Sequence, residues 1–506
     1  MSQLKYHYGL KFPIFPSDRQ TLIIKKSIDA SRFVYNHVNA THQTLYDLRQ
    51  IIGGFIDPYF AYRYQQRRWI NYHRRNTADF FAIDRLTSDT PAIDMLVKWQ
   101  LWGGWQNPEQ RTKKNYRAKY GQALSDFYLK PIANAVKIKR NFDFLQDKMI
   151  NSGVIGNAIR SYDAAWKLWA AARKAGRQSG TPRFKKKNHS GSGSYRVSNS
   201  YHTKEIPGMF NGDYCVVDND HVKLPTLGLI RTTPKDQQGR ILHSQSVIKS
   251  FLDSHQANVI RIGTITVRQN NVGQYFASFA LASDTPFRQQ LPKTGSEIGI
   301  DLNVENFLTT SDGQVVPNPH FYTNQERYLH RQQHDLSRKY RHAKADHAHL
   351  AKRKNYQAQR LIVAKKLKKI ADHRHAFLDE LSTQLIRQHD LIVLEQLKSK
   401  NLLKNHALAK RITDVGWRTF IQMLQYKADL YGRTVVLIDP KNTTQTCHHC
   451  GYICGSDYRH KKLKLADRHW ICPNCGTYHI RDHNAAQNIL SKGYQKLGAE
   501  DPTAEY

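Results

Sequence analysis

The order of apolar and polar positions predicts a chain with separate β and α regions. Residues 259–282 alternate apolar and polar side chains on both sides of a turn at 270–273, which predicts a β-hairpin. Residues 159–176 predict a helix that ends at a glycine, and the segment 321–415 contains neither glycine nor proline. In that segment five apolar side chains follow a helical stripe: Leu367, Ile370, Phe377, Leu381 and Leu385. Its other face is dense in Lys, Arg and His, which indicates either a solvated surface or a contact with nucleic acid.

Three acidic side chains stand where predicted elements end or begin. Residues 296–316 predict a strand, a loop and a second strand that turns at Asp312 and Gly313, and Asp301 ends the first strand. The apolar run 391–394 predicts a buried strand that ends at Glu395, and Asp482 precedes the small, helix-forming run NAAQNIL. Such acids repel one another unless a cation lies between them, and paired Mg²⁺ ions on carboxylates can support phosphodiester cleavage. The alternative is that each acid only caps its own element.

Two pairs of cysteines have the spacing of a zinc ribbon. Cys447 and Cys450 form one C-x2-C pair, Cys472 and Cys475 form the other, and residues 451–471 separate them. Because Zn²⁺ takes four thiolates in a tetrahedron, two tight turns can hold one ion between them. A glycine follows each pair, where such a turn needs a positive φ. The alternative is four thiols without a metal.

Other potential metal ligands lie near the two pairs, and the simplest interpretation is that they do not bind the ion: Cys454, His448, His449 and His479. The segment between the pairs is rich in cations and histidines: Arg459, His460, Lys461, Lys462, Lys464, Arg468 and His469. A zinc-bound loop with this charge is suited to contact phosphate.

The composition restricts the partners of the chain. The 506 residues suffice for several domains, and 77 Lys and Arg against 41 Asp and Glu give a net charge of +36. This excess predicts a large polyanion as partner. A membrane surface is the alternative, but no apolar run approaches the ~20 residues of a spanning helix, and the N-terminus lacks the apolar core of a signal peptide. Six cysteines, mostly gathered between 447 and 475, suit a reducing compartment and a metal.

Several motifs in combination resemble the TnpB family of transposon-encoded RNA-guided nucleases and its relatives, the miniature type V CRISPR effectors. The resemblance covers most of the chain. It implies that Asp301, Glu395 and Asp482 are the acids of a RuvC nuclease; Gln396, where the family commonly has Asp, lies outside this triad. The motifs are KFPIFPSDRQ and SRFVYN near the start, GTPRFKKK at 180–187 with SYRVSN after it, IGIDLNVENFLTTSDG at 298–313, LIVLEQLKSKNLLKN at 391–405, DVGWRTFIQMLQYKADLYGRTVVLIDP at 414–440, and the cysteine ribbon with RDHNAAQNI at 481–489.

The resemblance also implies an activity. It indicates an RNA-guided DNA endonuclease that binds a guide RNA, recognises a short flanking motif with guide-complementary double-stranded target DNA, and cleaves by two-metal-ion hydrolysis. The implied cofactors are Mg²⁺ or Mn²⁺, Zn²⁺ and the guide RNA, and the protein would be a cytoplasmic, nucleoid-associated monomer of a prokaryote that does not bind membranes. An RNA-guided DNA-binding regulator without cleavage stays open. DNA strand transfer is disfavoured, because TnpB-like proteins do not perform the joining step.

The implied fold class is multidomain α+β, with an RNase H-like (RuvC) nuclease, an inserted zinc ribbon, a split OB-like β-barrel (wedge) and a helical recognition lobe. The expected order is 1–25 wedge, 26–178 recognition lobe with an insertion at about 40–141, 179–292 wedge, 293–446 nuclease, 447–476 target-nucleic-acid-binding ribbon, 477–492 nuclease and 493–506 flexible tail.

Cations and aromatics alternate in the insertion at 40–141, which indicates stacking on bases and contact with phosphate. The alternative is that Trp99, Trp102 and Trp105 only pack a helical core. The predicted nucleic-acid contacts in the insertion and in the basic segment after it are Arg67, Arg68, Arg74, Arg75, Lys113, Lys114, Arg183, Lys185, Lys186, Lys187 and Arg196.

Overall fold

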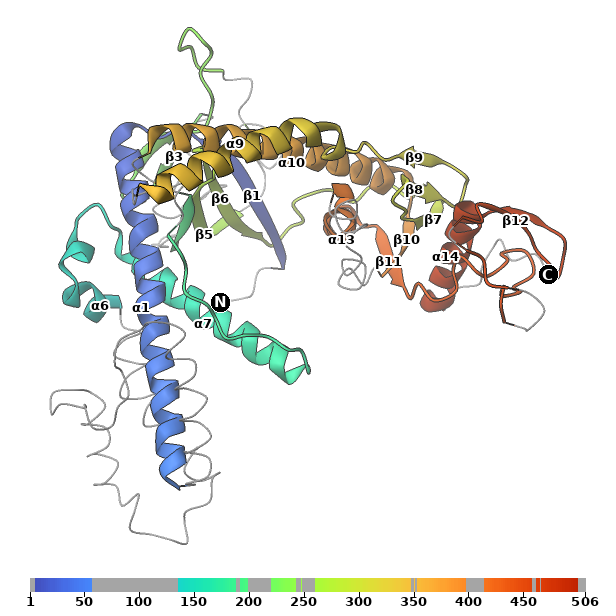
Figure 1. The fold of residues 1–506 in the computed structure, drawn as a ribbon, viewed down its shortest axis with the longest axis horizontal. Helices are drawn as coiled ribbons and strands as arrows, with labels where there is room; N and C mark the ends of the chain where they lie inside the picture. Colours follow the sequence, from blue (N-terminus) through green and yellow to red (C-terminus); the bar gives the residue numbers. More distant parts are fainter. Residues whose placement is uncertain are drawn as a thin grey trace. The chain divides into compact units, whose positions relative to one another are not determined.

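The computed structural model of the chain describes residues 5–56, 135–187, 192–198, 220–242, 247, 260–346, 350, 353–396, 414–456, 461–464 and 466–498, with side chains of the first helix described to residue 40 (Figure 1). The chain divides into two compact units. The N-terminal unit is His7–Ala282, and the C-terminal unit is Ser283–Tyr506 with Met1–Tyr6. Each unit combines helices with sheets, which confirms the multidomain α+β expectation.

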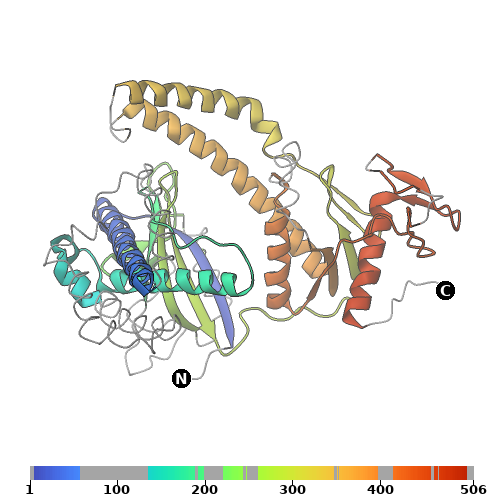
Figure 2. The same ribbon diagram turned by 60° about the horizontal axis from the view of Figure 1, so that its bottom comes forward.

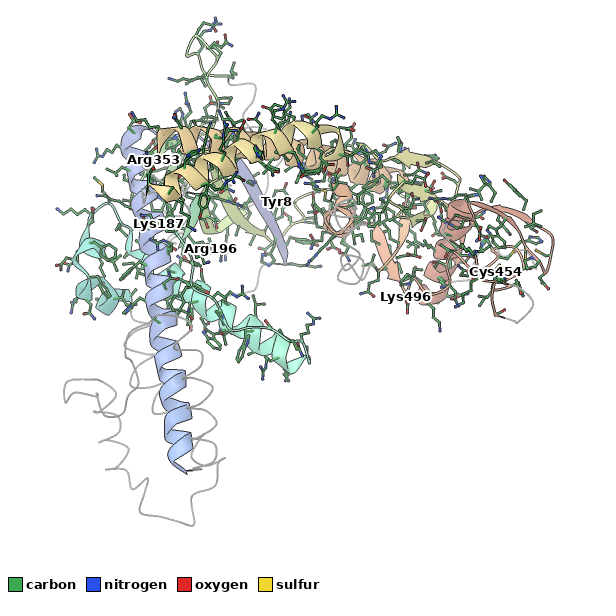
Figure 3. The ribbon with its side chains drawn as sticks, viewed as in Figure 1. Tyr8, Lys187, Arg196, Arg353, Cys454 and Lys496 are labelled. Atoms are coloured by element: carbon green, nitrogen blue, oxygen red, sulfur yellow. The ribbon has the colours of Figure 1, made fainter. Side chains whose placement is uncertain are left out.

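The N-terminal unit contains a four-stranded sheet in the order β1-β6-β5-β2. Its strands are β1 (Tyr6–Ile14), β6 (Tyr275–Ser283), β5 (Ile260–Gln269) and β2 (Gly193–Ser198), so the first strand of the chain pairs with a strand from its middle. The predicted β5–β6 hairpin is confirmed, since Asn270 N donates to Gln274 O at 2.9 Å and Gly273 has a φ of +87°. Arg196 stands on β2 with its side chain exposed (Figure 3).

One expected boundary falls inside a helix. Helix α1 (Asp18–Ile56) begins directly after β1, although residues up to about 25 were expected in the first strand region. The described strands form an open sheet and a separate two-stranded ribbon of β3 (His221–Leu224) and β4 (Gly228–Arg231), so the closed wedge barrel stays a prediction.

Four helical segments are described in this unit: α1, α6 (Ala135–Asn141), η4 (Asp143–Gln146) and α7 (Ser152–Lys174). Apolar side chains of α1 and α7, including Val34 and Ile155, share one buried cluster. Helix α7 contains most of the predicted helix and ends at Lys174, two residues before Gly176, whose φ is +70°. Most of the insertion at 40–141 lies outside the described residues.

The C-terminal unit is built on a five-stranded sheet in the order β11-β10-β7-β8-β9. Three strands run parallel, namely β7 (Glu297–Asp301), β10 (Leu391–Glu395) and β11 (Thr434–Ile438). Beyond β7 the sheet continues with two antiparallel strands, β8 (Asn306–Thr310) and β9 (Val315–Pro317). The predicted turn between β8 and β9 is confirmed, with a φ of +89° at Gly313. Ile298 and Ile300 of β7 are buried in the main core, as their pattern predicted.

The helices of this unit are α9 (Glu326–Ala345) after the short η6 (Thr323–Gln325), α10 (Lys354–Gln388), α13 (Trp417–Tyr431) and α14 (Arg481–Leu497). The segment without glycine or proline therefore contains two long helices, α9 and α10, which lie side by side (Figure 2). Ile370, Leu381 and Leu385 are buried as predicted. Leu367 is 40% exposed, so the prediction that it belongs to the buried stripe is wrong. No described helix is long and apolar enough to cross a membrane.

Candidate active site and metal centre

Two of the predicted acids end neighbouring strands of the C-terminal sheet. Asp301 is the last residue of β7, and Glu395 is the last residue of β10. The strands pair in parallel with Ile300 beside Leu394, so their carboxyl ends meet at one edge of the sheet. The predicted placement of both acids at strand ends is therefore confirmed, and their side chains approach from adjacent strands.

Helix α14 brings the third acid toward the same edge. Asp482 is its second residue, and the helix packs on β7 and β10. Two glycines allow this close approach: a Cβ on Gly299 would lie 2.2 Å from Ala486 O, and a Cβ on Gly493 would lie 2.4 Å from Val393 Cγ2. The small residues thus let the helix lie directly on the strands, which fixes the position of its first turn.

The other two carboxyl groups act electrostatically on Asp301. Burial, followed by the negative charges of Glu395 and Asp482, raises the pKa of Asp301 to about 8. Burial also raises the pKa of Glu395, while a hydrogen bond from the hydroxyl of Thr443 acts in the opposite direction. A divalent cation would relieve this mutual repulsion, and carboxylate oxygens suit Mg²⁺ or Mn²⁺. The donor set therefore fits such an ion.

Two arginines hold the carboxylate of Asp482. Arg481 donates from Nε and Nη2 to Asp482 Oδ1 at 3.1 and 3.0 Å, and Arg468 donates from Nη1 to Oδ2 at 3.1 Å. Arg468 also forms an ion pair with Glu305. The sequence indicated Arg468 as a phosphate contact and did not predict either arginine as a partner of the acid. A cation that binds Asp482 must compete with these guanidinium groups.

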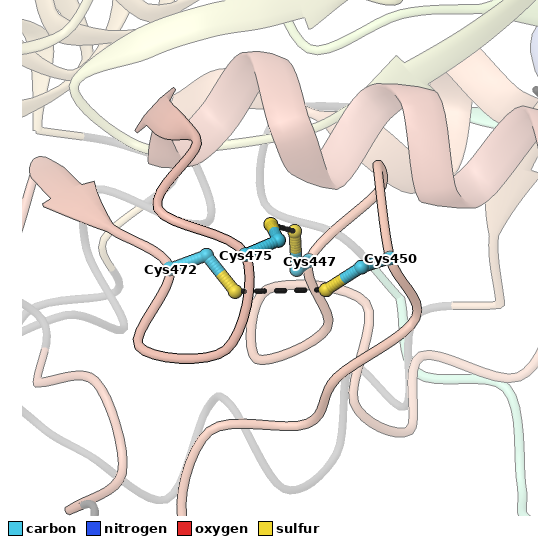
Figure 4. A group of neighbouring side chains, drawn as sticks. All are labelled: Cys447, Cys450, Cys472 and Cys475. Atoms are coloured by element: carbon cyan, nitrogen blue, oxygen red, sulfur yellow. Dashed lines mark hydrogen bonds between the residues drawn. The ribbon is translucent and has the colours of Figure 1, made fainter.

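The four predicted cysteines come together as one group (Figure 4). Cys447 Sγ lies 3.7 Å from Cys475 Sγ, Cys450 Sγ lies 3.7 Å from Cys472 Sγ, and all four sulfur atoms lie within 4.8 Å of one another. A tetrahedral ion with Zn–S distances of about 2.3 Å requires sulfur atoms about 3.8 Å apart. The geometry therefore fits Zn²⁺.

The turns that present the cysteines have the predicted backbone. Gly451 and Gly476, which follow the two pairs, have φ values of +72° and +76°. Hydrogen bonds with the side chain and backbone of Thr477 lower the pKa of Cys475 to about 6, whereas burial raises the pKa of Cys447 and Cys472. The backbone of the two turns agrees with a structural metal ribbon.

The spare donors near the pairs lie outside this group. Among the described residues, the four cysteines form the only group of three or more potential ligands that is this tight, and the three carboxylates do not form one. Cys454 is buried and packs with Trp470 beside the cluster. His479 Nε2 lies 3.0 Å from Cys447 Sγ, so this histidine contacts one of the four sulfurs without joining them.

The ribbon and the acid edge are joined through α14. Asn484 donates to Thr446 O at 2.8 Å and accepts from His448 N at 2.9 Å, and Asn488 donates to Thr443 O at 2.9 Å. Thr443 in turn donates its hydroxyl hydrogen to Glu395 Oε1. This connection was not predicted from the sequence, in which the two asparagines four positions apart on one helix face were the available signal.

The basic segment of the N-terminal unit is held at both ends. Trp169 Nε1 donates to Ser179 O at 3.1 Å. The backbone N of Lys185 donates to Asn36 Oδ1 at 2.7 Å, and Asn36 Nδ2 donates to Lys185 O at 2.9 Å. The Lys185 ammonium lies 3.9 Å from the Tyr35 ring centroid, so it faces the helix. The exposed predicted cations of this segment are Arg183, Lys185, Lys186 and Lys187. The predicted contacts of the insertion lie outside the described residues: Arg67, Arg68, Arg74, Arg75, Lys113 and Lys114.

Two family models match the C-terminal half of the chain. Residues 417–489, which contain the cysteines and Asp482, match "Cas12f1-like, TNB domain", and residues 278–406, which contain Asp301 and Glu395, match "Probable transposase". A cryo-EM structure of a Cas12f1-sgRNA-target DNA complex is similar with a TM-score of 0.45 and 15% identity, over 96% of this chain and 98% of that chain.

Curated relatives carry related names. A "Putative RNA-guided DNA endonuclease" from Streptomyces pristinaespiralis is 37% identical over 231 residues, which cover 46% of this chain and 52% of that protein. The "Putative RNA-guided DNA endonuclease InsQ" of Escherichia coli (strain K12) is 26% identical over 297 residues, which cover 55% of this chain and 64% of that protein. The chain thus spans about half to two thirds of the relatives' lengths. A TnpB-like protein of Acanthamoeba polyphaga mimivirus is 32% identical over 120 residues, 22% of each chain. The matched models, which together contain the three acids and four cysteines, cover less than half of the chain, and with these relatives they show that this part of the chain is similar to TnpB-like proteins.

Proposed function

We propose that this chain is a metal-dependent, RNA-guided DNA endonuclease in which Asp301, Glu395 and Asp482 hold the catalytic divalent ions. One observation carries the proposal: the last residues of two parallel strands and the first turn of α14 direct carboxyl groups to one edge. Burial, followed by the negative charges of Glu395 and Asp482, raises the pKa of Asp301 to about 8, so the ionised form of Asp301 is unfavourable unless a cation binds there.

Two Mg²⁺ or Mn²⁺ ions at this edge would activate a water molecule and stabilise the leaving oxygen of a phosphodiester. The chain's own residues prepare the site for this chemistry. Strand β7 and buried Asp301 give one oxygen donor a fixed position, and Thr443 orients Glu395 through its hydroxyl. Arg468, half-buried beside Asp482, supplies a positive charge that can move to a phosphate when an ion replaces it at the carboxylate.

The nucleic-acid partners follow from charge and from the names of the relatives. A net charge of +36 needs a polyanion, and the exposed lysines of the segment held by Asn36 can bind RNA phosphates. The relatives' names indicate guide RNA and target DNA, with base pairing to the guide providing sequence recognition. In this proposal one copy of the chain acts alone, the N-terminal unit contributes the wedge and the recognition lobe, and the ribbon binds target DNA.

The test uses the full chain purified with its RNA. That RNA is sequenced, a matching double-stranded target is built, and cleavage is followed with Mg²⁺ or with EDTA. Asp301→Asn should lower the cleavage rate by about a thousandfold or more and leave RNA and target binding intact. Asp335→Asn, an acid of α9 away from the sheet edge, is the matched control. Target binding without cleavage by the unsubstituted chain would favour the RNA-guided regulator instead, and cleavage by Asp301→Asn would refute the site.

A further inference from the structure

Helix α14 contacts one neighbouring segment through polar side chains that follow each other at intervals of four residues. Each of them donates to a backbone oxygen of the segment 437–446, which contains the end of β11 and the loop after it. Because four residues correspond to about one turn, the donors lie on one face of the helix. The donors are Asn484, Asn488, Lys492 and Lys496. The two lysines also bring positive charges to this contact, which hydrogen bonding alone does not require.

A further acid, Asp439, lies at the carboxyl edge of the sheet. Strands β10 and β11 pair in parallel with Glu395 beside Ile438, and Gln396 N donates to Ile438 O at 2.8 Å. Asp439 follows Ile438 directly, so it stands just beyond the end of the strand that neighbours Glu395. Its side chain is exposed, and Lys441 N donates to Asp439 Oδ1 at 3.3 Å. Asp439 was not among the acids predicted from the sequence.

Lys492 supplies a positive charge near the same carboxylate of Glu395. Its side chain is half-buried, and its Nζ donates to Lys441 O in the loop that follows Asp439. Burial raises the pKa of Glu395 most, and the hydrogen bond from Thr443 lowers it. Of the two charges, that of Lys492 lowers this pKa and that of Asp439 raises it. The lysine and the aspartate thus act on Glu395 with opposite signs.

We propose that Lys492 and Asp439 set the affinity of the acid edge, formed by Asp301, Glu395 and Asp482, for its divalent ions. Lys492 weakens their binding and Asp439 strengthens it. The proposal rests on the proposed function, because it concerns the ions that the three acids would hold. A fixed positive charge near Glu395 repels a divalent cation, and a fixed negative charge attracts it. Neither residue needs to be a ligand, since such a charge acts over several ångströms.

A purely structural role of Lys492 predicts the opposite result. Its hydrogen bond holds Lys441 O, and two residues further along the loop the hydroxyl of Thr443 donates to Glu395. If Lys492 only held this loop, its removal would loosen Glu395 and weaken the binding of an ion. If the charge of Lys492 dominates, its removal strengthens that binding. The sign of the change therefore distinguishes the two roles.

The test measures metal binding on the full chain purified with its RNA. Fe²⁺ can occupy carboxylate sites for Mg²⁺, and with ascorbate and peroxide it cuts the polypeptide beside the place where it is bound. The Fe²⁺ concentration that gives half of the maximal fragment yield reports the affinity. The fragments of the acid edge are those that Asp301→Asn loses. No chelator is added, and bound zinc is measured in every protein as a check of the fold.

Four substitutions separate the effect of charge from that of structure. Lys492→Met removes both the charge and the hydrogen bond, whereas Lys492→Arg keeps the charge. Asp439→Asn removes the negative charge at an exposed position, so it tests the proposal even if Lys492→Met loses stability. Lys496→Met is the matched control. Lys496 Nζ also donates to a backbone oxygen, Leu437 O at 2.7 Å, but Lys496 stands one helical turn further from Asp482 along α14.

Lys492→Met should lower the half-saturating Fe²⁺ concentration by about threefold to tenfold, and Asp439→Asn should raise it by a similar factor. Lys492→Arg and Lys496→Met should leave it unchanged. An unchanged or higher concentration in zinc-loaded Lys492→Met would overturn the proposal. So would an equal fall in Lys496→Met, or no rise in Asp439→Asn.

Target cleavage with Mg²⁺ is measured in parallel on the same proteins. If the unsubstituted chain gives neither fragments at the acid edge nor target cleavage, the proposed function is refuted and this proposal with it. If it gives both, and Lys492→Met leaves the half-saturating concentration unchanged, only the role of the two charges is refuted.

Discussion

The five-stranded sheet and the cysteine ribbon hold their functional side chains by different means. The sheet edge is supported by a large apolar core in which Phe307, Leu394 and Phe420 are at most 1% exposed. Among its described residues, the ribbon buries a cluster of only four, Cys447, Cys454, Trp470 and Cys472, and three of these are cysteines. The acids are thus positioned by packing, whereas the four-cysteine group fits a metal that would hold the ribbon in shape.

This difference predicts how each region should respond to the loss of a metal. A packed core tolerates the loss of a metal, because apolar burial and strand pairing remain. A ribbon with so little apolar burial needs its ion, and structural zinc contributes about 10–16 kcal/mol of apparent binding free energy in small zinc-finger peptides. The two regions meet at Thr443, Asn484 and Asn488, so damage to the ribbon can reach Glu395 through these hydrogen bonds.

Loss of a cysteine ligand should reveal the largest difference between the two regions. Cys472→Ser should remove the bound zinc, unfold the ribbon and lower target cleavage by about a hundredfold or more, because both Asp482 and Thr443 are attached to the ribbon. Zinc content and cleavage rate are measured on the full chain with its RNA. RNA binding and the helical signal in circular dichroism should persist, since the sheet and long helices do not need the ion.

Cys454→Ser is the matched control for that experiment. Cys454 is also buried in the ribbon but does not belong to the four-sulfur group, so this variant should keep its zinc and most of its cleavage rate. Zinc retained by Cys472→Ser and lost by Cys454→Ser would show that the ligand set is wrong. Cooperative unfolding of the whole chain after zinc removal would contradict the contrast between the two regions.

The connection between the regions should have a smaller effect. Thr443→Val keeps the size of a buried side chain but removes the hydroxyl that donates to Glu395. Loss of this hydrogen bond should cost about 1 kcal/mol, which corresponds to a cleavage rate about fivefold lower. Because that bond lowers the pKa of Glu395, its loss should also move the acidic limb of the pH–rate profile to higher pH.

Thr443→Ser restores the hydroxyl and should restore both the rate and the pH profile. A serine variant as impaired as the valine variant would show that the methyl group matters rather than the hydrogen bond. A normal pH profile in Thr443→Val would show that the hydroxyl does not tune Glu395.

The sequence predicted the acids and cysteines because local signals mark each of them. An apolar run that stops at an acid marks Asp301 and Glu395, and paired spacing marks the four cysteines. The contacts of Arg468 with Asp482 and of Thr443 with Glu395 have no such signal, because folding joins segments that have independent patterns. Leu367 failed for a related reason: a helical stripe only approximates the face that a neighbouring helix covers. The predicted wedge barrel and recognition lobe rest on the resemblance, since no local pattern defines how strands close into a barrel.

The smallest effect should appear in the stability of the metal-free sheet edge. The folded-state pKa of Asp301 is about 8, well above the value of about 3.9 for an unfolded chain. Between these values the folded state binds a proton that the unfolded state has lost, so Asp301 stabilises the metal-free protein below about pH 4, and this contribution is lost as the pH rises to about 8.

Asp301→Asn removes that titration while keeping the shape of the side chain. In buffer without added Mg²⁺ and without chelator, which leaves zinc on the ribbon, the melting temperature of Asp301→Asn minus that of the unsubstituted chain should therefore increase as the pH is raised from 5 to 8. Mg²⁺ should reduce this difference by stabilising the ionised acid in the unsubstituted chain alone. Asp335→Asn, whose carboxylate is paired on the surface of α9, should show no such trend. A difference that stays constant across this pH range would mean that Asp301 is not held among like charges, and the sheet edge would then be an ordinary strand end rather than a site that needs a cation.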